Sequence, residues 1–167
     1  MINLFSKSLF FLGLLIATII IFFDLLTKDQ VFYLLHDFRG SSYAIKNQIK
    51  ITNFFSLVYV NNNGISFGMF NQTSNAREIF AFLQGSIATF LIIWLWRVKE
   101  RHLSLALGLI IGGAFGNVID RIQNGGVTDF LDFYISSYHW PAFNLADTAI
   151  FIGVSIILFD EFILKKK

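Results

Sequence analysis

The side chains that could carry out acid–base chemistry gather in two short stretches in the second half of the sequence. In residues 125–133, Asp129 stands among mainly apolar neighbours, and in residues 140–147, Asn144 and Asp147 lie three positions apart, on one face of a helix. Two carboxylates held close together do not both ionise easily, so they share a proton. One can then act as a general base on a water molecule while the other donates a hydrogen bond to a scissile carbonyl group. That division of roles is the chemistry of an aspartic protease.

Spacing alone does not decide how these acids pair. We expect Asp129 to meet Asp147, but distance along the chain does not single it out over Asp120 or Asp132. The same pair could equally couple protons or ions in a transporter. Neither chemistry calls for a cofactor. The sequence also suggests no metal site, since it has no cysteine and its three histidines share no short spacing.

A third polar stretch closes an apolar run at residues 113–121. Asn117 lies three and four positions before Asp120 and Arg121, so the three side chains share one helix face. Asp120 and Arg121 are adjacent and do not face each other, and we expect each to pair with polar groups elsewhere. A purely structural interpretation is a polar cap at a helix end. Deeper in a bilayer, an Asp or Arg costs about 2.5–3.5 kcal/mol.

Apolar helices must position these groups. The chain has 167 residues, of which 55% are hydrophobic and only 14% charged, whereas soluble domains are about 25% charged. Four stretches of about 20 residues, the length that crosses a bilayer, are predicted as spans at residues 8–28, 77–97, 103–121 and 142–164. Pro141 suits the first turn of the fourth. We therefore predict an all-α membrane protein with four transmembrane helices, forming a single domain over residues 1–167.

The distribution of Lys and Arg predicts the orientation. With the N-terminus in the cytoplasm, seven of the 13 Lys and Arg residues fall on the cytoplasmic side, all of them in short segments that flank helices, as the positive-inside rule expects. Both termini are then cytoplasmic, and residues 29–75 form an extracytoplasmic segment. Alternating residues at 49–53 and 55–59 predict short strands there, and its many aromatic residues suit a small β-rich segment at the membrane surface. The net charge of +2 is too small to indicate nucleic-acid binding.

Glycines in the third predicted span suggest how the helices pack. Gly108, Gly112 and Gly116 recur every four residues and so line one face of the helix. Small residues at this spacing let helices approach closely in lipid. We expect these glycines to serve packing and to take no direct part in chemistry.

The polar stretches in their order along the chain resemble the lipoprotein signal peptidase family, also called signal peptidase II. The resemblance covers the whole chain and rests on five stretches, each beside a predicted span: Asp24 to Lys28, residues 60–67 (VNNNGISF), residues 113–121 (GAFGNVIDR), residues 127–130 (VTDF) and residues 141–147 (PAFNLAD). One stretch alone would be weak; five in order are specific.

The resemblance implies the roles of individual residues. Asp129 and Asp147 match the family's catalytic aspartates. The other matching positions are expected to support the site or hold substrate, and they are Asp24, Lys28, Asn62, Gly64, Gly113, Asn117, Asp120, Arg121, Asn144 and Ala146. Among these, Asp120 is expected to be structural, and Asp24 and Lys28 match a polar pair at the end of the first helix.

The resemblance also implies an activity. Members of the family remove signal peptides from prolipoproteins that carry a diacylglyceryl-modified cysteine, and they cut just before that lipidated residue. They act at the outer face of the bacterial inner membrane, need no cofactor, and are inhibited by the cyclic peptide globomycin. For this chain the implied partners are lipid-modified prolipoproteins, membrane lipid and such cyclic peptides, with no nucleic acid. We expect a monomer.

Two other classes of function compete with the peptidase. A small ion- or proton-coupled transporter could use the same acids, but transporters usually show inverted repeats and broken helices at mid-membrane. Here the polar residues gather toward one side and no repeat is found. A non-catalytic membrane assembly factor is the third possibility. It predicts that Asp→Asn substitutions leave function in cells intact.

Overall fold

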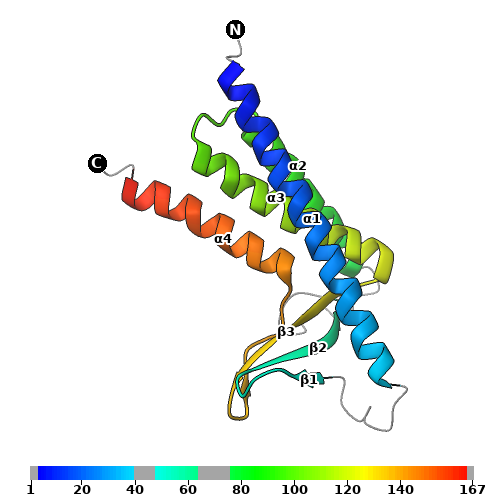
Figure 1. The fold of residues 1–167 in the computed structure, drawn as a ribbon. Coiled ribbons are helices and arrows are strands. Elements are labelled where there is room, and N and C mark those ends of the chain that lie inside the picture. The colour runs from blue at the N-terminus through cyan, green and yellow to red at the C-terminus, as the bar shows by residue number, and fades with distance from the viewer. Residues whose placement is uncertain (1–3, 40–47, 64–75, 165–167) are drawn as a thin grey trace.

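The computed structural model describes residues 4–39, 48–63 and 76–164, which form a helical bundle with a small sheet at one end (Figure 1). The helices are α1 (Leu4–Arg39), α2 (Ala76–Leu95), α3 (Arg101–Asn124) and α4 (Leu145–Phe159), and a π-helical turn, η1 (Asp160–Leu164), extends α4. The strands are β1 (Gln48–Lys50), β2 (Phe55–Asn62), β3 (Val127–Ile135) and β4 (Tyr138–His139). They form one antiparallel sheet in the order β1-β2-β3-β4.

Within the described residues, three helices are long and apolar enough to cross a membrane. These segments are Lys7–Leu35 in α1, Glu78–Leu95 in α2 and Arg101–Asn124 in α3. The mostly helical, membrane-type fold with a small sheet agrees with the prediction. Helix α4 has only 15 residues before the π-helical turn, which is shorter than the roughly 20 that span a bilayer. The fourth span therefore stays a prediction.

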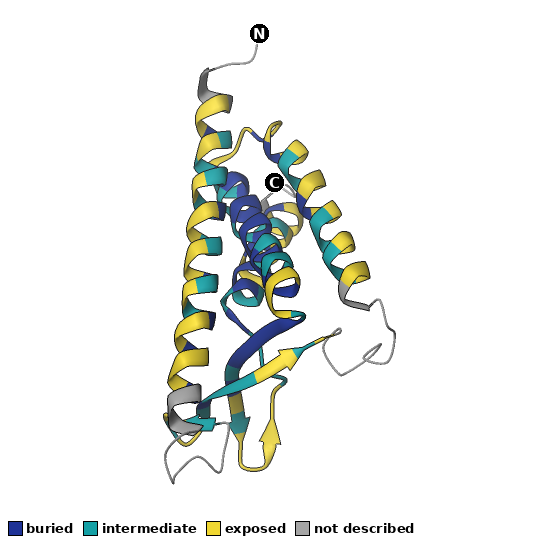
Figure 2. Cartoon of the chain, turned by 90° about the vertical axis from the view of Figure 1, so that its right-hand side faces the viewer, coloured by how far each residue is buried: buried dark blue, intermediate teal, exposed yellow. Residues whose placement is uncertain are grey.

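Helix α3 forms the centre of the bundle. Figure 2 shows buried residues concentrated along α3 and β3, while α1 and α2 carry exposed residues on their outward faces. The buried cluster around Leu107 and Ile111 joins α3 to Ala17 of α1 and Leu95 of α2. Large apolar side chains that remain exposed, such as Phe82 and Phe151, suit a lipid-facing surface, because lipid tails are as apolar as they are.

The glycines of α3 pack as predicted. A Cβ added at Gly108 or Gly112 would collide with backbone oxygens of α1, those of Gly13 and Ala17, and one added at Gly116 would meet the Asp24 carboxylate. The neighbouring Gly113 faces the Ala146 carbonyl oxygen of α4. Small residues thus bring α1 and α4 against α3 on two sides, and Gly113 and Gly116 do so beside the polar groups.

Gly112→Ala is expected to destabilise the protein. The new Cβ would lie 2.7 Å from the Ala17 carbonyl oxygen and 2.8 Å from Ile20 Cβ, and overpacking of this kind costs about 1–3 kcal/mol. The matched control is Gly85→Ala in α2, where an added Cβ meets nothing within 4 Å. Unfolding by SDS titration, followed by tryptophan fluorescence, measures both. Equal stability of the two variants would contradict the packing argument.

Two boundaries near the site differ from the predicted ones. Helix α1 does not end near Lys28 but continues to Arg39, so residues 29–39 are helical and do not belong to a β-rich segment. The reason is tertiary packing, since Val31 and Leu35 are buried against Phe130 of the sheet. Helix α4 begins at Leu145 and not near Pro141, because Asn144 caps it with an extended backbone.

The sheet also differs from the prediction. Strand β1 covers residues 48–50 instead of 49–53, and β2 continues past residue 59 to Asn62. Strands β3 and β4 come from the segment between α3 and α4, where we predicted no strand. Strand β3 pairs with β2, and β4 pairs with β3, so the segment between α1 and α2 and the segment between α3 and α4 form one sheet. This sheet places Asp129 directly beside the helix ends.

Candidate active site

Strand β3 places Asp129 at the junction of sheet and helices. The residue pairs in register with Val60 of β2, and it is only 3% exposed. Asn62, near the end of β2, donates a hydrogen bond from Nδ2 to Asp129 Oδ2 at 2.9 Å. The contact explains why β2 must extend to Asn62, because a strand ending at residue 59 would leave this carboxylate oxygen without its donor.

The start of α4 places Asp147 by a capping box. Asn144 Oδ1 accepts a hydrogen bond from the Asp147 backbone N–H at 2.9 Å, and Asp147 Oδ2 accepts one from the Asn144 backbone N–H at 3.4 Å. An N-cap asparagine with an acidic residue three positions later satisfies backbone N–H groups that the first helical turn leaves free. The three-residue spacing between Asn144 and Asp147 is therefore that of a helix N-cap, and the cap holds Asp147 in the first turn of α4.

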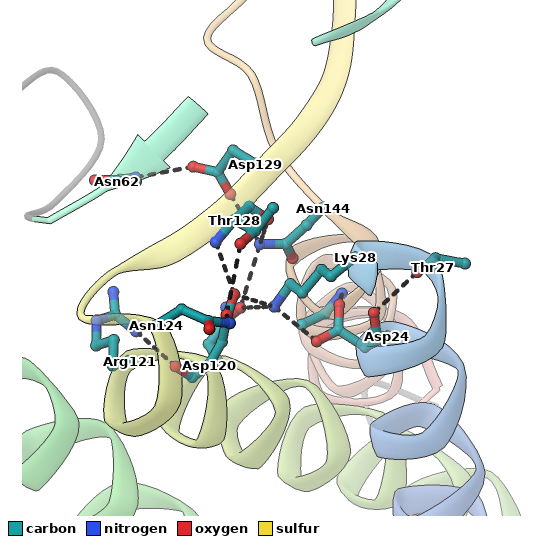
Figure 3. Close-up of polar contacts among 12 residues, drawn as sticks. Asp24, Thr27, Lys28, Asn62, Asp120, Arg121, Asn124, Thr128, Asp129 and Asn144 are labelled. Carbon is teal, nitrogen blue, oxygen red and sulfur yellow. Dashed lines mark hydrogen bonds and ion pairs between the residues drawn. The ribbon is translucent and has the colours of Figure 1, made fainter. Parts of the chain in front are cut away.

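Two asparagine amides join the two acids. Asn144 Nδ2 donates to Asp129 Oδ1 at 2.8 Å, and it also lies 3.2 Å from Asn117 Oδ1. Asn117 Nδ2 in turn donates to Asp147 Oδ1 at 2.8 Å. Both amides are buried, and Asn144 is completely so. Asp129 and Asp147 thus share one hydrogen-bond network, as Figure 3 shows for Asp129 and Asn144.

The surroundings of Asp129 favour its protonated form. The pKa of Asp129 is raised from 3.8 to about 7; burial is the main cause, and the negative charge of Asp147 acts in the same direction. The hydrogen bonds from Asn62 and Asn144, and the charge of Lys28, act in the opposite direction and are smaller than the effect of burial. A proton is therefore available on Asp129 near neutral pH.

A buried ionic cluster lies directly beneath this network. Lys28 Nζ is 2.7 Å from Asp24 Oδ2 and 3.2 Å from Asp120 Oδ2, and it donates to Asn117 Oδ1 at 3.0 Å. Asp24 Oδ1 accepts from the Ala146 backbone N–H at 2.9 Å. The cluster therefore ties α1 to α3 and to the first turn of α4, as Figure 3 shows for Asp24, Lys28 and Asp120. It also orients the side chain of Asn117 through Oδ1.

Asp120 fixes the start of β3. Its Oδ2 accepts from the Thr128 backbone N–H at 2.7 Å, and its Oδ1 accepts from Asn124 Nδ2 at 2.7 Å. Asp120 thus pairs with groups other than its neighbour Arg121, as predicted. Its bond to Thr128 sets the position of the next residue, Asp129.

Arg121 has a partner that the sequence analysis missed. Its Nη1 donates to Gln84 Oε1 of α2 at 2.7 Å and lies 3.4 Å from the Asn117 carbonyl oxygen. The signal that could have revealed Gln84 is a lone amide inside an otherwise apolar span, because polar side chains in such segments usually face the bundle interior.

The remaining candidates are Asp132, Gly113 and Gly64. Asp132, on the same strand as Asp129, lies apart from the network, with its Oδ1 2.9 Å from His139 Nδ1. Gly113 has no side chain, and this lets the Ala146 backbone come close to α3. Gly64 lies outside the described residues. Among the residues that the structure describes, no group of three or more His, Asp and Glu side chains could hold a metal ion.

The sequence of this chain matches that of a known protein family. A model of the family described as "Signal peptidase (SPase) II" matches residues 16–163. The chain belongs to the signal peptidase II family. Lipoprotein signal peptidases of Burkholderia ambifaria and Vibrio campbellii are both 44% identical to it, over 149 residues (87% of this chain and 84% of theirs) and 123 residues (72% and 73%) respectively.

Solved structures show the same architecture. Two that are described as bacterial membrane enzymes, at 2.3 Å and 1.9 Å resolution, superpose with TM-scores of 0.70 and 0.73. They are 28% and 27% identical to this chain; each alignment covers 90% of this chain, and 89% and 92% of the other. Membership in the signal peptidase II family makes this chain a membrane peptidase, in keeping with its apolar helices.

Proposed function

We propose that the protein removes signal peptides from diacylglyceryl-modified prolipoproteins and cuts just before the lipidated cysteine, using Asp129 and Asp147 to activate water. The single observation that supports this most is the shared network. The amide of Asn144 donates to Asp129 and that of Asn117 donates to Asp147, while burial raises the pKa of Asp129 to about 7. One acid with a proton beside one that can accept a proton is the requirement of aspartic-protease chemistry.

In the proposed first step, Asp147 takes a proton from a water molecule as the water oxygen attacks the carbonyl carbon of the residue before the cysteine. Asp129 gives its proton to the carbonyl oxygen, so that a neutral tetrahedral diol forms. In the second step the carbon–nitrogen bond breaks, and the proton on Asp147 moves to the leaving amine of the cysteine. A diol hydroxyl returns a proton to Asp129, which restores the starting state.

The supporting residues have distinct proposed roles. Asn62 and Asn144 hold the Asp129 carboxyl in place, and Asn117 holds that of Asp147. Asp24, Lys28 and Asp120 form the rigid base beneath them. Gly113 and Ala146 permit close approach of α3 and α4, and Arg121 adds positive charge beside the acids. For Gly64, which lies outside the described residues, the proposed role is to support the site or hold substrate.

The proposed setting is the bacterial inner membrane, with both termini in the cytoplasm. The sheet and the acids then lie at the outer face. For the fourth span we propose α4 together with η1, which together run from Leu145 to Leu164 and so reach the length that a bilayer requires. The whole chain forms one membrane-embedded domain over residues 1–167.

The proposed partners follow from the site. The substrate is a membrane-embedded signal peptide whose lipid anchors its scissile bond near the interface, at the depth of the acids. Cyclic peptides such as globomycin are proposed to occupy the same site, and membrane lipid surrounds the helices. No nucleic acid is involved. Because one chain supplies all the described members of the acid network, we propose that the monomer is active.

The pH dependence of cleavage provides one test. Activity is expected to fall on the alkaline side with a midpoint near pH 7, because loss of the proton from Asp129 removes the acid of the first step. Asn62→Ala removes a hydrogen bond that lowers the pKa of Asp129, so this midpoint should move to higher pH. Initial cleavage rates of both proteins between pH 5 and 9 measure the shift. A midpoint that stays fixed or moves down would contradict the assignment.

Flux measurements separate the peptidase from the transporter. Liposomes containing the pure protein are expected to show no proton or cation flux above that of empty liposomes. Flux that disappears in Asp129→Asn, together with no cleavage of any lipid-modified prolipoprotein, would replace the peptidase by a transporter.

A further inference from the structure

Within the part of the chain that the structure describes, the guanidinium of Arg121 is held through one nitrogen, Nη1. Its Nη1 has two acceptors, Gln84 Oε1 at 2.7 Å and the Asn117 carbonyl oxygen at 3.4 Å. Its Nε is buried and has no hydrogen-bond partner among the described residues. The carboxyl groups that act electrostatically on the guanidinium are those of Asp147, Asp129 and Asp120. The orientation of this cation beside the acid pair therefore depends on the acceptors of Nη1.

Gln84 differs from two other polar side chains of α2. Ser86 and Thr89, on the same helix, donate to carbonyl oxygens of their own helix, those of Phe82 and Gly85. Gln84 instead reaches to α3. A primary amide in an apolar span is costly unless it is paired, and a planar guanidinium bonded through one nitrogen to a fixed acceptor loses much of its freedom to rotate.

We propose that Gln84 is a positioning residue of the peptidase: it fixes the guanidinium of Arg121 from α2, so that the positive charge faces the acid pair. This inference rests on the proposed function. In the first chemical step, charge moves between water, the two carboxyls and the carbonyl oxygen. A cation held in a fixed place stabilises such shifting charge better than one that must reorient during the reaction.

The test uses two substitutions of Gln84 and one matched control. Gln84→Leu keeps a side chain of similar size but removes the acceptor, and Gln84→Glu keeps an acceptor at the same position. Ser86→Ala, two residues further along α2, is the control, because that hydroxyl bonds only to its own helix in the described structure. We expect Gln84→Leu to lower kcat about 10–100-fold with little change in KM, since small misplacements of a catalytic group cost this much. Gln84→Glu and Ser86→Ala should stay near the wild-type rate.

A double variant separates positioning from simple stabilisation. If Gln84 acts through Arg121, then adding Gln84→Leu to Arg121→Met should lower kcat no further, because the group to be positioned is gone. If each substitution instead lowers kcat by its own factor and the two factors multiply in the double variant, the proposal is overturned. A Gln84→Leu variant whose kcat per folded molecule equals that of wild type, whatever its stability, would also overturn it.

A second readout does not require cleavage. With ¹⁵N-labelled arginine, the Nη signals of Arg121, assigned by their loss in Arg121→Met, should be resolved in the wild type and averaged by rotation in Gln84→Leu. Identical spectra in the two proteins would refute the positioning role even if the wild type cleaved its substrate. Conversely, a wild type that cleaves nothing but shows the spectral change would refute the proposed function and leave the Gln84–Arg121 contact in place.

Discussion

Asp129→Asn and Asp147→Asn are each expected to lower the rate of prolipoprotein cleavage by at least about 10²–10⁴-fold, the range that a positioned acid or base contributes. An asparagine at either position has nearly the same shape, and its one amide oxygen can still accept the hydrogen bond of Asn144 or Asn117, although it lacks the second acceptor oxygen of the carboxylate. It cannot transfer the proton. The helices and the sheet should therefore form as before, and only the chemical step should fail.

The matched control for these variants is Asp132→Asn. Asp132 lies on the same strand and is also buried, but it contacts His139 and not the asparagine network. We expect it to keep its rate within about tenfold, below the range expected for a lost acid or base. Single-turnover cleavage by purified, monodisperse protein gives the three rates. Full activity in either Asp129→Asn or Asp147→Asn would remove that acid from the mechanism.

The second large effect concerns stability. Lys28→Met is expected to destabilise the fold by about 3–5 kcal/mol, because removing one partner of a buried ion cluster leaves uncompensated charge inside the protein. Lys28 is 3% exposed, and its partners Asp24 and Asp120 are 0% and 1% exposed. The loss should also reduce activity, since Lys28 orients Asn117.

SDS titration measures this loss, and two further variants define its cause. Lys50→Met changes a lysine in β1 that is exposed to solvent, and it should alter stability by no more than about 0.5 kcal/mol. Adding Asp24→Asn to Lys28→Met removes one of the two negative charges left without a partner, and it should recover part of the stability. If Lys28→Met unfolds like wild type, the ionic cluster is not what fixes α1 against α3 and α4.

The helical part of the fold could be predicted because lipid imposes simple rules. A bilayer requires long apolar helices, and glycines repeated every four residues indicate where such helices meet. Gly108 and Gly112 indeed face the α1 backbone. The polar residues of the candidate site could likewise be collected from their positions at helix ends. Each pairs across elements that are far apart in sequence, as Lys28 does with Asp120.

The sheet and the helix boundaries were harder to predict because tertiary contacts decide them. Strand β3 has alternating features too weak to separate it from a loop, and its pairing with β2 is what makes it a strand. Helix α1 runs past Lys28 because the sheet gives Val31 and Leu35 a surface to bury. Gln84 escaped notice because its meaning depends on Arg121, which lies on another helix.

The most direct test of the account is a cleavage assay with purified protein and one prolipoprotein in two forms, with and without the diacylglyceryl group on its cysteine. Mass spectrometry of the products locates the cut. We predict that the wild type cleaves the lipid-modified form and leaves the lipidated cysteine as the new N-terminus, whereas the Asp129→Asn variant does not cleave it. No cleavage by folded wild type, a cut at another bond, or cleavage that survives in Asp129→Asn would contradict the proposed function.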